Sequence, residues 1–130
     1  MADSSLADII DSLRSDDSKE RRRGFSDAEA YLDADQVDVG LAPSFVDALL
    51  PALSDSNPKF AQGALGLLIA LVELMGEDLH PYIGGVWTPL VERLGDAKVA
   101  NRERAVDLAV ALSTLVVAAA TALEKLRPGF

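Results

Sequence analysis

The side chains that most often carry out chemistry are scarce in this sequence. It has no cysteine and a single histidine, His80. A transition-metal site would therefore have to rest mostly on carboxylates, which such metals do not favour. Gly84-Gly85 lacks the flanking pattern of a phosphate-binding loop, and Asp16-Asp17 lacks the spacing of a calcium loop. We expect no catalytic residue, no metal and no cofactor, and predict that the protein is not an enzyme.

The basic side chains are more informative, because they are clustered. Eight of the 12 lysines and arginines fall in three short stretches, each at the expected start of the second helix of a pair. In a stack of repeated helix pairs, equivalent turns lie along one edge. We therefore expect the turns at residues 15–18, 54–57 and 95–97 to share an edge and to form a basic ridge. The eight cations are Lys19, Arg21, Arg22, Arg23, Lys59, Lys98, Arg102 and Arg104.

The alternative reading of these cations is ordinary surface charge. A helix dipole disfavours cations near a helix N-terminus, so each of these positions carries a small electrostatic penalty. Repetition of that penalty in three turns favours a binding role over chance placement. Because the net charge of the chain is −9, the ridge would be a basic strip on an otherwise acidic protein.

A repeat of about 40 residues underlies this placement. Residues 53–71 recur 41 residues later as residues 94–112, and a fainter copy begins 40 residues upstream at Leu13. In the two better copies Leu53 matches Leu94, and Asp55 matches Asp96. Similarity at one fixed period of this length is the signature of HEAT or armadillo repeats. The sequence therefore predicts an all-α HEAT-repeat solenoid that forms one domain, residues 1–130.

Apolar periodicity predicts three helix pairs, in repeats at about 3–34, 41–76 and 79–117. The expected helices are residues 3–14, 19–33, 43–53, 58–75, 81–94 and 97–116. Asn57 and Asp96 are the predicted N-caps, and Gly76 is the predicted C-cap. Whether a seventh helix starts near Ala118, in a partial fourth repeat at 118–127, stays open. The third pair should bury an inner face made of Tyr82, Val86, Trp87, Leu90, Val91 and Leu94.

The composition of the chain limits the classes of partner that we expect it to bind. The chain is 49% hydrophobic, which is enough for a core, and its acidic balance opposes nucleic acid and anionic membranes. The longest apolar run, residues 108–123, falls short of the ~20 residues that span a bilayer. The absence of cysteine fits a cytoplasmic protein.

The C-terminal segment is more apolar than a capping repeat should be. We therefore expect self-association through its apolar side chains, which are Val110, Leu112, Leu115, Val116, Val117 and Leu123.

The turns themselves resemble those of a known family. Residues 53–65 and 90–105 look like the second and third repeats of a TOG domain, most closely that of the cytoplasmic-linker-associated protein (CLASP) class. Residues 16–23 resemble the first-repeat turn of that class more weakly, and residues 76–83 fit the segment that leads into its third repeat. Three features depart from the pattern: the first loop has no tryptophan, Pro58 replaces a bulky apolar residue, and Asn101 replaces the valine before Arg102.

The resemblance implies a microtubule-stabilising, plus-end-associated regulator of the cytoplasm and the spindle. TOG domains are HEAT-repeat paddles that bind αβ-tubulin through their intra-repeat loops, and tubulin is acidic. A HEAT-repeat scaffold for another acidic protein is the alternative function. By resemblance, the tubulin-facing positions are Lys19, Arg22, Asn57, Pro58, Lys59, Lys98 and Arg102.

Overall fold

The computed structural model describes residues 5–34 and 37–126, with the side chains of these residues apart from 119 and 121–126. The described part contains helices and turns and no strand. The elements are α1 (Leu6–Leu13), α2 (Ser18–Asp33), η1 (Val39–Leu41), α3 (Ala42–Leu53), α4 (Pro58–Met75), η2 (Gly76–Tyr82), η3 (Gly84–Val86), α5 (Trp87–Leu94) and α6 (Val99–Leu126), where η marks a 3₁₀ helix.

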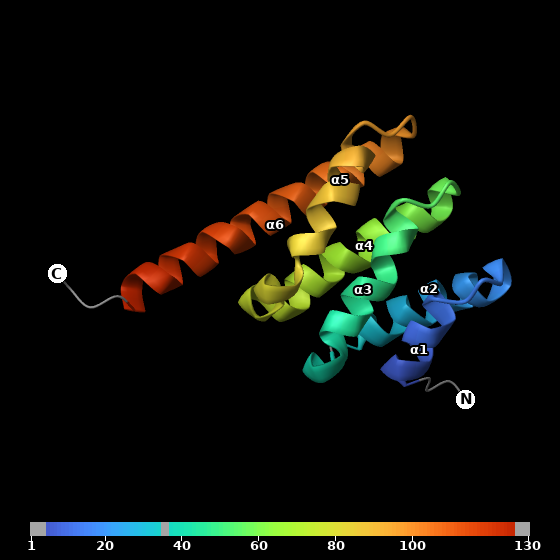
Figure 1. The fold of residues 1–130 in the computed structure, drawn as a ribbon, viewed down its shortest axis with the longest axis horizontal. Helices are drawn as coiled ribbons and strands as arrows, with labels where there is room; N and C mark the ends of the chain where they lie inside the picture. The colour runs from blue at the N-terminus through green and yellow to red at the C-terminus, as the bar shows by residue number, and fades with distance from the viewer. Residues whose placement is uncertain (1–4, 35–36, 127–130) are drawn as a thin grey trace.

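The six α-helices form three stacked antiparallel pairs, α1–α2, α3–α4 and α5–α6 (Figure 1). The first helices of the pairs contact one another in one layer, α1 with α3 and α3 with α5. The second helices do the same in the other layer, α2 with α4 and α4 with α6. This is the two-layer arrangement of a HEAT-repeat solenoid, as predicted.

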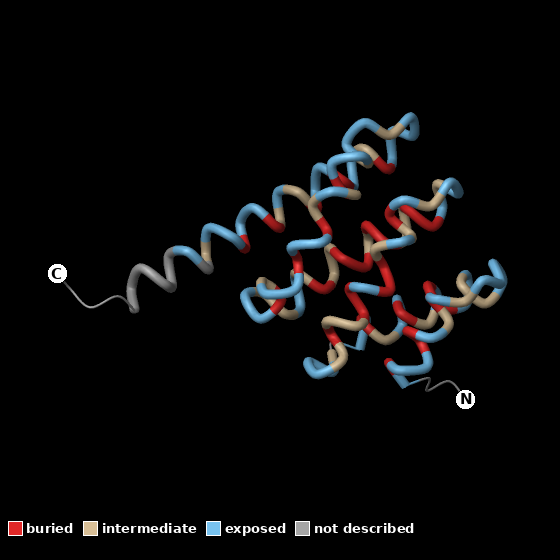
Figure 2. The backbone as a smooth tube through the Cα atoms, viewed as in Figure 1, coloured by how far each residue is buried: buried red, intermediate tan, exposed pale blue. Residues whose placement is uncertain are grey.

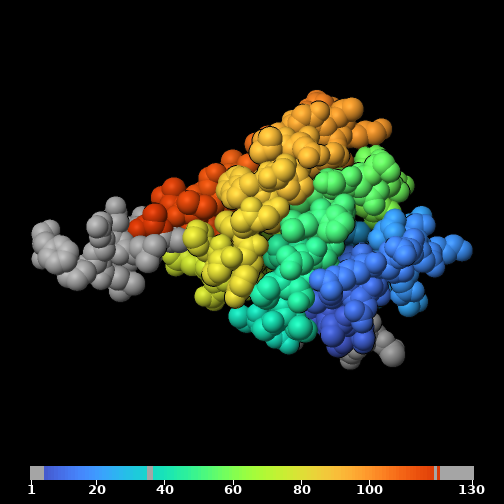
Figure 3. Space-filling view, in the orientation of Figure 1, coloured from blue at the N-terminus to red at the C-terminus, as the bar shows by residue number. Residues whose placement is uncertain are grey.

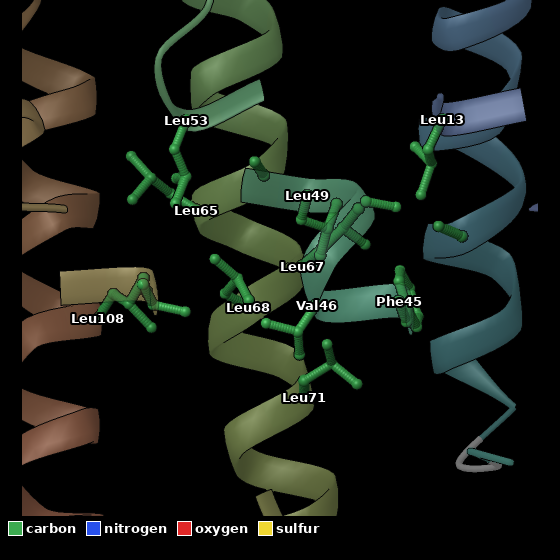
Figure 4. Close-up of a cluster of buried hydrophobic side chains, with 14 of the residues drawn as sticks. Leu13, Phe45, Val46, Leu49, Leu53, Leu65, Leu67, Leu68, Leu71 and Leu108 are labelled. Atoms are coloured by element: carbon green, nitrogen blue, oxygen red, sulfur yellow. The ribbon is translucent and has the colours of Figure 1, made fainter. Parts of the chain in front are cut away.

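Helix α4 lies at the centre of the stack, which explains why it is apolar on several sides. It contacts α2, α3 and α6, and its residues Leu65, Leu68 and Leu71 are buried among side chains from α3 (Figures 2 and 4). The stretch Pro58–Tyr82 is also long and apolar enough to cross a bilayer, judged by length and composition alone. Its place between two neighbouring repeats accounts for the same composition.

The ends of α4 agree with the sequence. Asn57 is its N-cap and Pro58 its first residue, where the missing N–H of proline costs nothing. Gly76 is its C-cap, as predicted, with a φ of 55°, a left-handed conformation that glycine adopts without strain. The predicted helix at 3–14 is observed as Leu6–Leu13, and its residues 3–4 lie outside the described part.

The third pair differs from the prediction at its first helix. Helix α5 begins at Trp87 and not near Pro81, because residues 76–86 form two 3₁₀ segments that are separated at Ile83, the second of which starts with Gly84-Gly85. The expected inner face is only partly buried. Val86 and Leu90 lie in the core and Trp87 is half-buried, but the side chains of Tyr82, Val91 and Leu94 are exposed.

Helix α6 runs unbroken from Val99 to Leu126, so the separate seventh helix near Ala118 is not observed. Neither glycine nor proline interrupts residues 97–126, and the continuous helix keeps all its backbone hydrogen bonds. Its C-terminal half projects beyond the rest of the stack (Figure 1). Of the expected C-terminal apolar set, Leu112 and Leu115 are buried in the core, and Val110, Val116 and Val117 are exposed. The side chain of Leu123 lies outside the described part.

A candidate protein-binding edge

The three intra-repeat turns lie on one side of the molecule, as predicted. Figure 1 shows the α1–α2, α3–α4 and α5–α6 turns at the same ends of their helix pairs, and Figure 3 shows them as three separate projections. Each turn spans the short connection between two helices, at residues 14–17, 54–57 and 95–98. We call this surface the turn edge.

All three turns share one hydrogen bond between a side chain and the backbone. A side-chain oxygen accepts from the N–H two residues later: Ser15 Oγ from Asp17 at 3.1 Å, and Asp55 Oδ1 from Asn57 at 2.8 Å. In the third turn Asp96 Oδ1 accepts from Lys98 at 2.7 Å. Short polar side chains stabilise turns in this way by imitating a backbone acceptor.

The residue that donates this N–H is also the N-cap of the following helix, and there the third turn differs. Asp17 Oδ1 and Asn57 Oδ1 each accept from a backbone N–H two residues later, both at 3.0 Å. In the third turn the carbonyl of Lys98 accepts the first helical bonds, from the N–H groups of Asn101 and Arg102 at 3.1 Å each, which makes Lys98 the N-cap residue. The prediction that Asp96 caps α6 is therefore wrong, because Asp96 lies two residues earlier and stabilises the turn.

Asp96 is the most strongly held carboxylate of the turn edge. The pKa of Asp96 is lowered from 3.8, chiefly because its carboxylate accepts the Lys98 N–H, with further help from Asn101 and Arg93; partial burial opposes the shift. Its Oδ2 lies 2.7 Å from Arg93 Nη1. Because the folded-state pKa is depressed, the ionised carboxylate stabilises the fold above the unfolded pKa. That stabilisation is lost as the pH falls through the folded-state value.

Five of the seven predicted site residues are exposed on or beside the turn edge: Lys19, Arg22, Asn57, Lys59 and Lys98. Within the described residues, the ion pairs are Arg21–Asp55, Arg23–Glu20 and Arg93–Asp96, so none of these four cations is in one. Arg22, Asn57 and Lys59 also border an open groove of about 390 Å³ between α2 and α4. Phe25, Glu29, Phe60 and Gly63 complete the lining of the groove.

Arg102 and Pro58, the other two predicted site residues, are engaged within the fold. Arg102 Nη1 donates to the carbonyl oxygens of Asp96 at 2.8 Å and Ala97 at 3.3 Å. The carbonyl of Pro58 accepts from Asn101 Nδ2 at 3.2 Å. These contacts hold the shape of the third turn and join it to the second.

Three residues join adjacent turns in a role that the sequence did not predict, and one of them, Arg21, was expected as a cation of the basic ridge. Arg21 Nη1 donates to the Ser15 carbonyl at 2.9 Å, its Nη2 lies 3.9 Å from Asp55, and its guanidinium sits 4.8 Å from the ring centre of Phe60. Phe60 stacks on Phe25 at 5.6 Å between ring centres. These contacts join the first turn to the second.

Asn101 is the third of these residues and joins the second turn to the third. Its side chain is 1% exposed and donates to the Pro58 carbonyl and, at 3.5 Å, to Asp96 Oδ2. The alignment of the repeats contained a sign of these roles. Arg21 and Arg102 occupy matching positions in the first and third repeats, and Phe60 and Asn101 match in the second and third.

The turn edge shows no arrangement suited to metal binding. Across residues 5–34 and 37–126, no group of three or more histidine or carboxylate side chains converges. The features that remain are exposed cations, the exposed amide of Asn57 and an open groove. Such a surface fits recognition of a macromolecule through charge and shape.

Comparison with known proteins gives relatives of one kind. No protein-family model matches the chain. A CLIP-associated protein of Arabidopsis thaliana is 33% identical over 102 residues, which is 77% of this chain and 7% of that protein. A CLIP-associating protein of Drosophila melanogaster is 35% identical over 60 residues, or 46% of this chain and 4% of that protein. The chain therefore spans a small part of the length of these relatives.

Comparison with a solved structure shows that the similarity extends to the fold. The crystal structure of the MAST/Orbit N-terminal domain, a TOG-type HEAT-repeat solenoid, superposes with a TM-score of 0.74 at 28% sequence identity. The match covers 88% of this chain and 51% of that one. Three stacked helix pairs, a shared turn geometry and similarity in both sequence and fold together identify this chain as a TOG-type HEAT-repeat domain of the CLASP family.

Proposed function

We propose that the chain is a non-enzymatic module that binds αβ-tubulin through the turn edge, as part of a cytoplasmic, microtubule-associated regulator. The observation that carries this proposal is the repetition of the turns. Each of the three turns contains the same hydrogen bond from a backbone N–H to a side-chain oxygen two residues earlier, and each presents at least one exposed cation at the same edge. The family relationship to CLASP proteins supports the choice of tubulin as the partner.

Electrostatics supports the same surface. A chain with a net charge of −9 repels an acidic partner over most of its surface. Cations gathered on one edge orient the partner toward that edge and raise the association rate. The contact set has two parts. Lys19, Arg22, Lys59 and Lys98 supply the charge, and Asn57 supplies an exposed amide between them.

Arg102 and Pro58 act indirectly in this proposal. Both make internal hydrogen bonds, so their contribution is to hold the second and third turns in a fixed relation. A rigid edge loses less conformational entropy on binding than a set of mobile loops does.

The test removes one cation from each of the two best-matched turns. In the Lys59→Ala, Lys98→Ala double variant, we expect affinity for purified αβ-tubulin to fall by about five- to thirtyfold, with each rim charge contributing on the order of 0.5–1 kcal/mol. Fluorescence anisotropy at two salt concentrations measures the affinity. The wild type should lose affinity with added salt more steeply than the double variant does.

The matched control has the same net charge but an intact turn edge. Val39→Asp with Gly84→Asp takes the net charge from −9 to −11, as the double alanine variant does. Val39 is exposed, and a Cβ at Gly84 meets no atom within 4 Å, so both changes should be accommodated. The control should bind tubulin nearly as well as the wild type. Equal affinity of all three proteins, or no binding by the wild type, would overturn the proposal and leave the scaffold for another acidic protein.

A further inference from the structure

Three successive arginines near the start of α2 have different surroundings. Arg21 donates to a carbonyl of the first turn, and its guanidinium sits 4.8 Å from the ring centre of Phe60. Arg23 pairs with Glu20, at 3.3 Å between Nη2 and a carboxylate oxygen. Arg22 is exposed, and within the described residues its guanidinium takes part in no ion pair or hydrogen bond. Arg22 is therefore the arginine of this run whose donors stay available to a partner.

Arg22 also borders the open groove of about 390 Å³ between α2 and α4. Lys59 and Asn57 line the same groove from the start of α4. Asn57 Oδ1 accepts from the backbone N–H of Lys59, so the amide nitrogen of Asn57 is left to donate to an anion. The rings of Phe25 and Phe60, both buried, form the apolar part of the lining. The groove thus combines two cations and an amide donor with an apolar surface.

Two further lining residues limit what the groove can hold. Gly63 has no side chain, and a Cβ there would lie 3.1 Å from the ring of Phe25, so a larger residue would narrow the groove. Glu29 is exposed and follows Arg22 by seven residues, which is about 10 Å along a helix. At that distance salt screens most of its repulsion of an anion beside Arg22. An extended or multiply charged anion would reach Glu29 and be repelled, so the lining favours a single small anion.

A carboxylate side chain fits this lining. The planar guanidinium of arginine can donate two parallel hydrogen bonds to the two oxygens of a carboxylate, which an ammonium group cannot do. Lys59 adds a second positive charge. The buried rings keep water away from one side of such a pair, which strengthens the attraction, and they give the methylene groups of an acidic side chain an apolar surface.

We propose that the groove binds one aspartate or glutamate side chain of αβ-tubulin, and that Arg22 is the residue that fixes its position. This inference rests on the proposed function and assigns different roles to the cations within it. Lys19 and Lys98 attract the acidic partner as point charges, whereas Arg22 holds one carboxylate at a defined place between α2 and α4. The residue type at position 22, and not only its charge, then determines affinity.

Variants that preserve charge test this inference. Arg22→Lys keeps the net charge of −9 but removes the planar pair of donors, and we expect affinity for purified αβ-tubulin to fall by about tenfold. Arg23→Lys is the matched control, because it makes the same replacement at an exposed arginine outside the groove lining. The control should bind within about twofold of the wild type. Circular dichroism melts of the three proteins should coincide.

Stopped-flow kinetics separates a positioned contact from a steering charge. Loss of a hydrogen-bonded charge pair raises the dissociation rate, whereas removal of a peripheral charge mainly lowers the association rate. Arg22→Lys should therefore raise the dissociation rate by about tenfold and leave the association rate nearly unchanged. Lys98→Ala should have its main effect on the association rate.

The outcomes distinguish this inference from the proposed function. Equal dissociation rates for the wild type, Arg22→Lys and Arg23→Lys would overturn the inference. Tubulin binding through the turn edge would still stand in that case, provided that the Lys59→Ala, Lys98→Ala variant binds more weakly than the wild type. A wild type that does not bind tubulin would overturn the proposed function and this inference with it.

Discussion

The second and third turns share a hydrogen bond that shapes the turn, but they contact the preceding repeat through different kinds of side chain. In both, an aspartate accepts the N–H two residues later, at 2.8 Å from Asp55 and 2.7 Å from Asp96. Five residues after that aspartate, however, the second turn has Phe60 and the third has Asn101. Phe60 contacts the preceding repeat through an aromatic stack and the guanidinium of Arg21. Asn101 contacts the preceding repeat through a hydrogen bond to the Pro58 carbonyl.

This difference shows that a repeat can keep the geometry of a turn while changing how the turn is joined to its neighbour. Phe60 and Asn101, which follow their turns at matching positions, both contact the preceding repeat. An apolar contact and a polar contact serve the same purpose there, which is to set the spacing between successive turns. Variants of Phe60 and of Asn101 measure separately how much the apolar and the polar junction contribute to stability.

The largest effect is expected at the apolar junction. Phe60→Ala should lower the free energy of unfolding by about 3–5 kcal/mol, because it removes a buried ring and leaves a cavity between two repeats. Urea denaturation followed by circular dichroism measures the loss. Phe60→Leu keeps most of the volume and should cost less than half as much. A loss below about 1 kcal/mol for the alanine variant would mean that this ring does not hold the repeats together.

A smaller effect is expected at the polar junction. Asn101→Ala should cost about 1–3 kcal/mol, because it removes the hydrogen bonds that the buried Asn101 side chain donates to the Pro58 carbonyl and to Asp96. The same denaturation experiment applies. Ser113→Ala, at an exposed position of the same helix, is the control and should change stability by no more than about 0.5 kcal/mol. If the two alanine variants prove equally stable, the hydrogen bond to Pro58 contributes nothing.

The smallest effect is a gain at the third N-cap. Lys98→Asn should raise the free energy of unfolding by about 1 kcal/mol, since asparagine can accept the free N–H of the first turn and lysine cannot. Removal of a cation from a helix N-terminus adds to the gain. Thermal melts of this variant and of Lys59→Asn make the comparison. Because Asn57 already caps α4, Lys59→Asn should leave the melting temperature nearly unchanged, and an equal rise in both would exclude capping as the cause.

The sequence predicted the fold well because the repeat imposes one register on the turns and helices. The match of Leu53 with Leu94 places two helix pairs in equivalent positions, and both leucines end the first helix of a pair. The start of α5 was harder to predict. Residues 81–86 have apolar residues at helical spacing, but the 3₁₀ geometry there depends on packing against α3 and α4. Val91 and Leu94 were expected in the core but are exposed. Periodicity shows that a residue lies on the apolar side of a helix, but only the tertiary arrangement decides whether another element covers it.

The candidate site was predictable in outline only. Clustered cations located the three turns, and the structure places those turns on one side of the molecule. That Asp96 stabilises the turn and does not cap α6 could not be read from residue type, because an aspartate accepts the N–H two residues later both in such a turn and at an N-cap. The match of Asp96 with Asp55 does resolve the ambiguity, because Asp55 lies two residues before the N-cap Asn57 and so belongs to the turn. The internal hydrogen bonds of Arg102 depend on its side-chain conformation, which a sequence pattern does not specify.

The pairwise stacking of the helices also bears on how the chain folds. The main contacts join each helix to its partner in the pair and to the corresponding helix of the next pair, so most contacting residues are close in sequence. Chains with such local contacts fold fast, because little loop entropy is lost before contacts form. Helix α4 has neighbours on both sides, whereas α1, only eight residues long, lies at one end of the stack. Opening should therefore begin at the ends, and the amides of α4 should be the last to exchange with solvent.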